Sequence, residues 1–309
     1  MFVFSLLTDI KVQPGEEDVE MALDVAFETI NGYESNKNTQ IKLYIILYNV
    51  FQANEKYRYT VFMKLLEFCE KNNWAVVIKA NLQIIDKLSQ PWEISANERI
   101  LMYKKAIELF KSFEEPLLAY ELMLKTIELF GEDPTLISKN KQFITDTIIL
   151  ALQHPKIAQF EKLYNTPAVK LQIEENSSEK LFELLHIFTH KELKDYNEWE
   201  QKNKTFLDGS SIDAEVCRNK IMYLSFCSLA MKDNVISYSE LCKIVGISKD
   251  QIEDWIIDAI TNNIIDARID QEREEIVINT FTQRTTNLRE RLDTVASNFI
   301  DVVQFLYSA

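Results

Sequence analysis

Apolar residues recur at helical spacing from about residue 16 to about residue 205, with short polar breaks between the runs. Within each run they recur at the spacings i, i+3, i+4 and i+7, which places them on one face of a helix. The clearest sets are Ile41, Tyr44, Ile45, Tyr48 and Phe51; Val61, Leu65, Phe68 and Cys69; Ile100, Tyr103, Ile107 and Phe110; and Leu118, Leu122 and Leu129. This pattern predicts a succession of α-helices.

The breaks between the runs carry helix start and stop signals. Ser95 and Glu98 have the spacing of a capping box, in which the hydroxyl and the carboxylate each bind a backbone N–H at a helix start. Gly131 can adopt the left-handed conformation that ends a helix, and Asp133 followed by Pro134 is typical of the next helix start. Closely spaced helices with such short connections favour an antiparallel helical-repeat array.

The pattern changes after Asp-Gly-Ser-Ser at 208–211, which is the best domain boundary in the chain. Beyond it, three helical patterns precede two alternating apolar runs that flank a polar turn. The helices are expected over 214–232, 237–246 and 248–263, a short strand at 235–236, and the two longer strands at 265–269 and 276–278. Three helices followed by two strands predict a winged helix.

The third helix of this module has an apolar inner face. We expect the winged-helix core to contain Ile252, Trp255, Ile256, Ala259 and Ile260. Nothing around Trp255 suggests a cofactor, but tryptophan is also common at interface hot spots. A core position is our interpretation, and an exposed interface anchor is the alternative.

The charge of the third helix argues against groove binding. It holds one base, Lys249, against four acids, Asp250, Glu253, Asp254 and Asp258. The wing adds Arg268 and Arg273 among further acids. Because a helix in the major groove faces phosphates on both sides, this module is interpreted as a protein-binding or packing element without direct DNA contact. Direct RNA binding by the winged helix stays open as an alternative from a different class.

A last helix carries a heptad seam. Its apolar residues are Leu288, Leu292, Val295, Phe299, Val302 and Leu306, which step by four and three residues alternately. The seam predicts a C-terminal bundle helix that forms a partner interface, and folding back on its own winged helix is the alternative. The predicted domains are residues 1–208, a helical-repeat domain; 209–281, a winged helix; and 282–309, the bundle helix.

Composition narrows the class of protein. The chain has five Gly and six Pro among 309 residues, which suits a mostly α fold. Its formal charge of −14 disfavours binding of phosphates by the whole surface. Its four cysteines form no C-x-x-C pair, and no apolar run approaches the roughly 20 residues of a membrane span. We therefore expect a soluble, cytoplasmic protein with reduced thiols and no membrane contact.

Catalytic and cofactor motifs are missing from the sequence. His186 and His190 share a helical face, but Ile187 stands where a zinc hydrolase of the H-E-x-x-H type needs glutamate. Phosphate-binding glycine loops and the G-x-S-x-G nucleophile motif do not occur. The sequence therefore predicts no catalytic residue, no metal and no cofactor, and hence a protein that is not an enzyme.

A helical array, a winged helix and a terminal bundle helix, in this order, resemble the PCI-domain family of the proteasome lid, the signalosome and translation initiation factor three. The segments that carry the likeness most specifically are similar to a PCI subunit of translation initiation factor three. They are 47–51, 57–61, 151–155, 167–170, 181–188, 196–208, 252–260 and 269–271, and the likeness covers most of residues 40–285.

This resemblance implies a non-catalytic scaffold subunit of translation initiation factor three. It implies the other PCI and MPN subunits of that complex as partners, with the small ribosomal subunit contacted indirectly through the complex. In this family, winged helices associate into an arc and C-terminal helices enter a common bundle. A PCI scaffold subunit of the signalosome or the proteasome lid is the alternative assembly.

Overall fold

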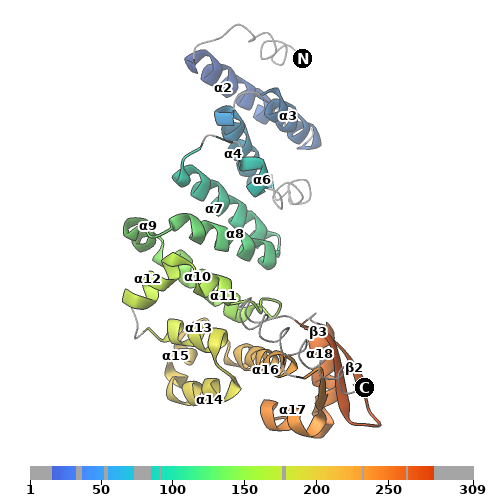
Figure 1. The fold of residues 1–309 in the computed structure, drawn as a ribbon. Coiled ribbons are helices and arrows are strands. Elements are labelled where there is room, and N and C mark those ends of the chain that lie inside the picture. The colour runs from blue at the N-terminus through green and yellow to red at the C-terminus, as the bar shows by residue number, and fades with distance from the viewer. Residues whose placement is uncertain are drawn as a thin grey trace, which may run out of the picture. The chain divides into compact units, whose positions relative to one another are not determined.

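The computed structural model describes residues 16–32, 37–51, 55–72, 85–90, 92, 94–175, 179–231, 233–261 and 264–281. The chain divides into two compact units, residues 1–126 and 127–309, with the division inside helix α8 (Pro116–Phe130). The ribbon in Figure 1 carries the element labels used below. The predicted domain boundary at residue 208 lies within the second unit and stays a prediction.

The first unit is built from helices that pack on one another. They are α2 (Glu16–Gly32), α3 (Lys37–Val50), α4 (Glu55–Asn72), α6 (Ile85–Ser89), α7 (Ala96–Ser112) and most of α8. Helix α2 packs on α3, α3 on α4, and α4 on α7. The predicted capping box at the start of α7 is confirmed: the Ser95 hydroxyl accepts from the Glu98 N–H, and the Glu98 carboxylate accepts from the Ser95 N–H at 2.8 Å.

The second unit opens with helices that lead into the winged helix. They are α9 (Pro134–Lys139), α10 (Lys141–Gln153), α11 (Glu161–Tyr164), α12 (Pro167–Glu175), α13 (Lys180–His190), α14 (Leu193–Lys202) and α15 (Lys204–Gly209). Asp133 caps α9 through the N–H groups of Thr135 and Leu136, with Pro134 at the first helical position. Gly131 has the left-handed conformation expected of a helix end, with φ +56°. The start and stop signals in the sequence are therefore confirmed here.

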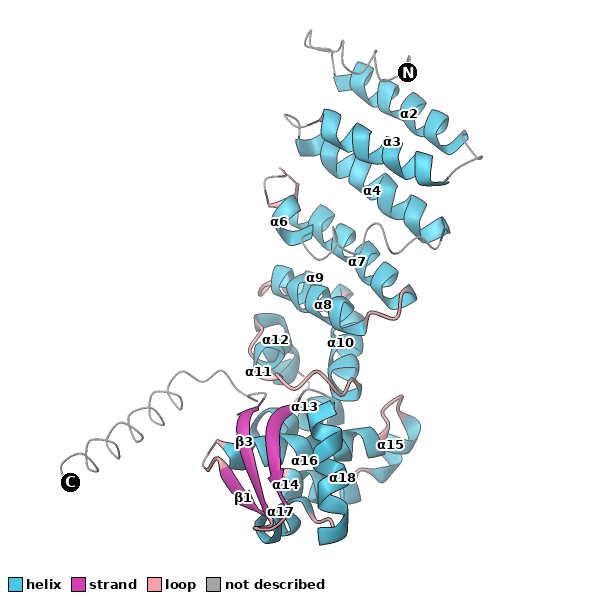
Figure 2. Ribbon diagram, turned by 90° about the vertical axis from the view of Figure 1, so that its right-hand side faces the viewer, coloured by secondary structure: helices cyan, strands magenta, loops and turns pink. Residues whose placement is uncertain are grey.

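The winged helix has the predicted order of elements. It consists of α16 (Ala214–Ala230), β1 (Val235–Ser237), α17 (Tyr238–Val245), α18 (Lys249–Thr261), β2 (Ile265–Asp270) and β3 (Glu275–Phe281). The three strands form an antiparallel sheet in the order β1-β3-β2, which lies beside α16 and α18 in Figure 2. In the register, Ile276 of β3 lies between Ile236 and Ile269. Gly246, at φ +77°, ends α17 as predicted.

The mostly α fold, a helical array followed by a winged helix, is confirmed. The predicted C-terminal bundle helix stays a prediction, because its seam lies outside the described residues. The seam residues concerned are Leu288, Leu292, Val295, Phe299, Val302 and Leu306.

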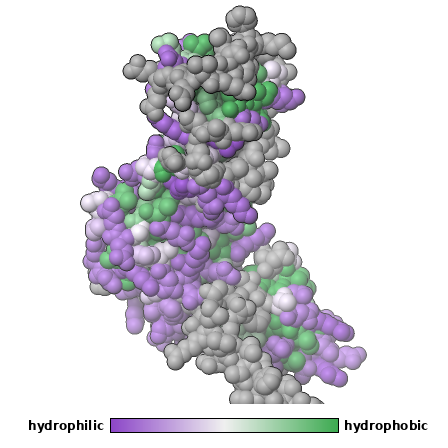
Figure 3. Space-filling model, turned by 45° about the horizontal axis from the view of Figure 1, so that its top comes forward, coloured by the Kyte–Doolittle hydropathy of each residue, from purple (hydrophilic) through white to green (hydrophobic). Residues whose placement is uncertain are grey.

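Hydrophilic residues predominate among the described residues on the face shown in Figure 3. In the face shown in Figure 3, hydrophobic side chains gather in several separate groups among hydrophilic ones. Across the described residues, no helix combines the length and the apolar character that a bilayer crossing needs.

Candidate interaction surface of the winged helix

The interior of the winged helix is formed where α18 packs on α17 and β2. Ile252, Ile256 and Ala259 of α18 are fully buried, together with Leu241 of α17 and Ile276 of β3. These α18 residues are three and four positions apart, so a helical period brings them to one face. Ile260, at the last turn, is only partly buried. Three of the five predicted core residues therefore meet in the interior.

Trp255 lies at the margin of this interior, on the side of α16. Its ring stacks on Tyr223, with centroids 4.6 Å apart and planes at 16°, and meets the edge of Phe226 at 5.7 Å. The residue is half-buried. Its indole Nε1 is enclosed and has no hydrogen-bond partner within the described part of the chain. The two ring contacts of Trp255 join α18 to α16. The role of Trp255 as a core residue stays a prediction.

The outer face of α18 is acidic. Asp250, Asp254 and Asp258 are exposed and four residues apart, so they form a stripe along the helix. Beside this stripe, Ile257 is 51% exposed. A stripe of carboxylates opposes the approach of phosphates.

The bases and acids of α18 and the wing engage one another. Lys249 forms an ion pair with Glu274, which lies in the turn between β2 and β3, residues 271–274. Glu253 accepts hydrogen bonds from the Tyr238 hydroxyl at 3.0 Å and from the Gln271 amide at 2.7 Å. Burial, and then the hydrogen bond to Glu253, raise the pKa of Tyr238 to about 12. Lys249, the one base of α18, is therefore matched by a wing carboxylate.

A shallow pocket of about 460 Å³ lies between α18 and the wing. Its lining contains the carboxylates of Glu253, Asp270 and Glu272 and one cation, Arg268. Next to it, β2 pairs with β3 and has no second strand neighbour among the described residues. An open strand edge offers backbone donors and acceptors to an added strand. The module is therefore suited to contacts with protein and poorly suited to contacts with nucleic acid.

Lys220 anchors the winged helix to the helices before it, a role that the sequence reasoning missed. Its Nζ donates to the carbonyls of Ala151 and, at 2.7 Å, of His154, at the end of α10, and lies 4.9 Å from the Phe160 ring centroid. The sequence does contain a signal that the Lys220 side chain is buried. Lys220 lies three residues after Cys217 and four before Leu224, on the apolar face of α16.

A second anchor joins α14 to α16. Leu193 N–H donates to the Ser225 hydroxyl at 2.9 Å, and Arg218 pairs with the carboxylate of Glu200. Burial of Ser225 among helices makes the first of these bonds a fixed contact, because water cannot replace it. The winged helix and α14 are therefore one packed body within the second unit.

The two histidines considered for metal binding are exposed on α13. The rings of His186 and His190 have centroids 5.1 Å apart, and His186 Nδ1 is 3.1 Å from the Tyr164 hydroxyl. Over the ranges that the structure describes, no group of three His, Cys, Asp or Glu side chains is placed to hold a metal ion.

Comparison with known proteins finds a match to one domain family within the second unit. Residues 193–280 match the PCI domain, so the match begins at the first residue of α14 and ends in β3. The matched region includes both α14 and the winged helix, which the contacts above join.

Relatives match over most of the chain. Eukaryotic translation initiation factor 3 subunit M of Dictyostelium discoideum is 24% identical over 91% of the chain and 70% of the relative. The subunit M proteins of Xenopus tropicalis and Pyricularia oryzae are 25% and 26% identical, over 94% and 77% of the chain. The chain spans 78% of the Xenopus protein and little more than half, 56%, of the Pyricularia protein. Residues 193–280 thus form a PCI domain, and the chain as a whole is similar to subunit M of eukaryotic translation initiation factor 3.

Proposed function

We propose that this chain is a non-catalytic scaffold subunit of eukaryotic translation initiation factor 3. The observation that carries the proposal is the extent of the similarity to subunit M, which covers 91% of the chain in one relative and 94% in another. Similarity of that extent includes the helical array as well as the PCI domain. A shared winged helix alone would not distinguish between PCI assemblies.

The proposed partners are the other PCI and MPN subunits of the factor, with the small ribosomal subunit contacted through the complex in the cytoplasm. Two features support an assembly role. The edge of β2, which has no second strand neighbour in the described part of the chain, can accept a neighbouring strand, and the heptad seam from Leu288 to Leu306 can enter a helix bundle. A scaffold needs contact surfaces and no reactive group, which agrees with the lack of catalytic motifs in the sequence.

Direct RNA binding is the weaker proposal, because the exposed face of α18 carries the acidic stripe of Asp250, Asp254 and Asp258. Membership of the signalosome or the proteasome lid is the other alternative. It predicts a different set of copurifying subunits.

Sucrose-gradient sedimentation of a cell lysate tests the proposed function. A tagged chain is expected in the fractions of the small ribosomal subunit, and salt that strips initiation factors should move it to lighter fractions. A chain that stays in the light fractions under all conditions, while a known initiation factor 3 subunit sediments with the ribosomal subunit, would contradict the proposal.

A further inference from the structure

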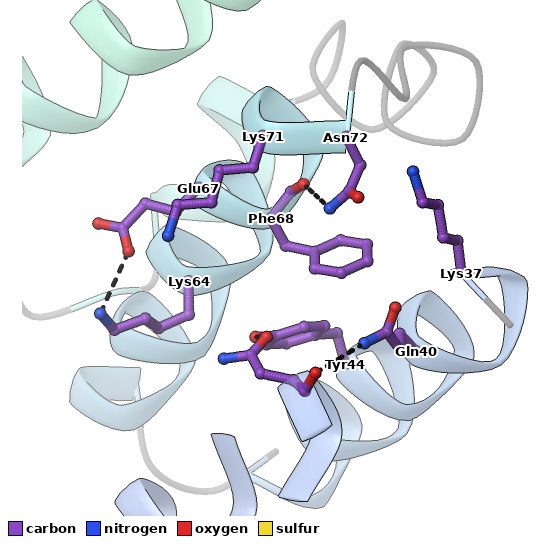
Figure 4. A pocket seen from close by; sticks show the side chains of 9 residues that line it. Lys37, Gln40, Tyr44, Lys64, Glu67, Phe68, Lys71 and Asn72 are labelled. Atoms are coloured by element: carbon purple, nitrogen blue, oxygen red, sulfur yellow. Dashed lines mark hydrogen bonds and ion pairs between the residues drawn. The ribbon is translucent and has the colours of Figure 1, made fainter. Parts of the chain in front are cut away.

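An open pocket of about 570 Å³ lies in the first unit, far along the sequence from the PCI domain. It forms where the end of α2, the start of α3 and the last turns of α4 meet, and Figure 4 shows the side chains that line it. Asn31 comes from α2, Gln40 and Tyr44 from α3, and Phe68 and Asn72 from α4.

The charge of this pocket has the opposite sign to that of the protein. Its lining contains three lysines, Lys37, Lys64 and Lys71, and one carboxylate, Glu67, whereas the chain as a whole has a formal charge of −14. In Figure 4, Lys37 lies on one side of the Tyr44 and Phe68 rings, and Lys64 and Lys71 lie on the other.

The single carboxylate is already neutralised. Glu67 pairs with Lys64 at 3.1 Å and also with Lys105, which lies outside the lining. The hydrogen bond from Lys105, more than any other contact, lowers the pKa of Glu67, so this group is ionised at neutral pH and fully matched. Lys37 and Lys71 have no carboxylate within ion-pair distance among the described residues. Two exposed cations are thus left to face the pocket.

The walls of the pocket are fixed by contacts of their own. Gln40, which is buried, donates to the Ile30 carbonyl at 2.8 Å, and Asn72 donates to the Phe68 carbonyl at 2.8 Å. Tyr44 and Phe68 pack with ring centroids 5.5 Å apart. Because the Gln40 and Asn72 amides are engaged within the chain, the ammonium groups of Lys37 and Lys71 are the charged donors that remain for a ligand.

The start of α3 adds to the positive potential. This 14-residue helix begins at Lys37 and has no acidic residue in its first turn. Within the described residues, the positive end of its dipole therefore meets no acidic side chain of its own first turn, and it favours an anion on the same side of the pocket as Lys37.

We propose that this pocket binds a short acidic peptide segment of a partner protein. The volume is larger than a single phosphate or carboxylate needs, and cations on both sides of the aromatic floor suit a segment with two or more carboxylates. Lysine pairs with an anion as a point charge, which fits carboxylates on flexible side chains. A long nucleic acid fits less well, because phosphates beyond the pocket would meet a surface with a large excess of acids. The proposal does not depend on which assembly contains the chain.

The test uses a short glutamate-rich peptide labelled with fluorescein and the purified full chain. Fluorescence anisotropy at low salt should detect binding that weakens as salt rises, and a matched peptide with glutamine in place of glutamate should not bind. Lys37→Glu with Lys71→Glu should weaken the binding at least about tenfold. The matched control is Lys42→Glu with Lys87→Glu, which makes the same change of net charge at exposed positions of α3 and α6 outside the lining.

The expected result is a large loss for the pocket variant and a change of less than about twofold for the control. Both pairs of lysines are exposed, so circular dichroism should show parental melting for both variants. Equal loss in the two variants, binding of the glutamine peptide, or no binding by the parent would overturn the proposal. Tighter binding of single-stranded polyuridylate that is lost only in the pocket variant would also overturn it, in favour of an RNA site. Sedimentation with the small ribosomal subunit is a separate readout, so the two proposals can fail independently.

Discussion

The Lys220 amine is a hydrogen-bond donor placed where the fold offers it carbonyl oxygens. The last carbonyls of a helix have no partner within the helix and carry the negative end of its dipole. At the end of α10, the carbonyl of Ala151 receives its hydrogen bond from Lys220, which comes from α16. Without that donor, a buried carbonyl would lose its partner, at a cost of about 1–3 kcal/mol.

The titration of Lys220 gives a prediction about pH. Burial lowers the pKa of this lysine from 10.5 to about 7. Between these two pKa values the Lys220 amine binds more protons in the unfolded chain than in the folded chain. Its contribution to the free energy of unfolding therefore rises with pH, by at most about 1.4 kcal/mol per pH unit. Urea unfolding at pH 7 and at pH 9 should show this gain in the parent chain and not in Lys220→Met.

The control for this experiment is Lys243→Met, because Lys243 of α17 is exposed. It should keep the parental difference between the two pH values. A Lys220→Met variant with the same difference as the parent would show that the buried amine does not titrate in this range.

Trp255 gives a second prediction at this scale. Trp255→Ala removes the stack on Tyr223 and the contact with Phe226, and should lower the free energy of unfolding by about 3 kcal/mol. Thermal melting measures this, with Ile257→Ala as the control on an exposed position of the same helix. A Trp255→Ala chain that melts like the parent and still fails to assemble would place Trp255 in an interface.

Helix starts and ends were predictable from the sequence where the residue concerned interacts with, or shapes, the backbone next to it. Ser95, Asp133 and Gly246 carry such signals, and all three end or begin helices as expected. Lys220 was not predictable in this way, because its partners are backbone groups more than 60 positions earlier in the chain. Residue type alone places lysine on the surface.

At the scale of elements, α18 and the wing decide between protein and nucleic acid as a partner. With its stripe of acids facing outward, the purified chain should bind RNA or DNA only weakly at physiological salt. Asp250→Lys with Asp254→Lys should strengthen binding, which shows that the assay detects this face. Submicromolar binding by the parent chain that is lost on substitution of Lys249, Arg268 or Arg273 would contradict the prediction.

The C-terminal seam is the other element with a predicted interface. Leu292→Asp with Phe299→Asp would place two charges in a packed bundle, at a cost on the order of several kcal/mol. Incorporation into the complex should fall, while circular dichroism of the isolated chain stays parental. Ser297→Asp with Gln304→Asp, off the seam of the same segment, is the matched control. Normal copurification of the seam variant with its partners would rule out this role.

Periodicity predicted the longer elements and not the shortest ones. Helix α18 and strands β2 and β3 follow their apolar patterns closely, because in each the residues of one face are more buried than those of the other. Helices α9, α11 and α15 have six residues or fewer, too short for a period of 3.6 to repeat clearly. Their positions are set by the helices on which they pack.

At the scale of the whole molecule, composition predicted a mostly helical chain, and one three-stranded sheet accompanies the described helices. The division at 126/127 has no composition signal, since it falls within α8. The basic pocket also escaped the sequence reasoning. Its three lysines lie on two helices, and only the packing of these helices brings them together, in a chain whose overall charge is negative.

Native mass spectrometry of the assembly purified through a tag on this chain tests the central claim most directly. A scaffold subunit of initiation factor 3 should be recovered as one copy in an intact complex with the other PCI and MPN subunits of that factor. Recovery with signalosome or proteasome lid subunits, or as a free chain under conditions that keep initiation factor 3 intact, would contradict it.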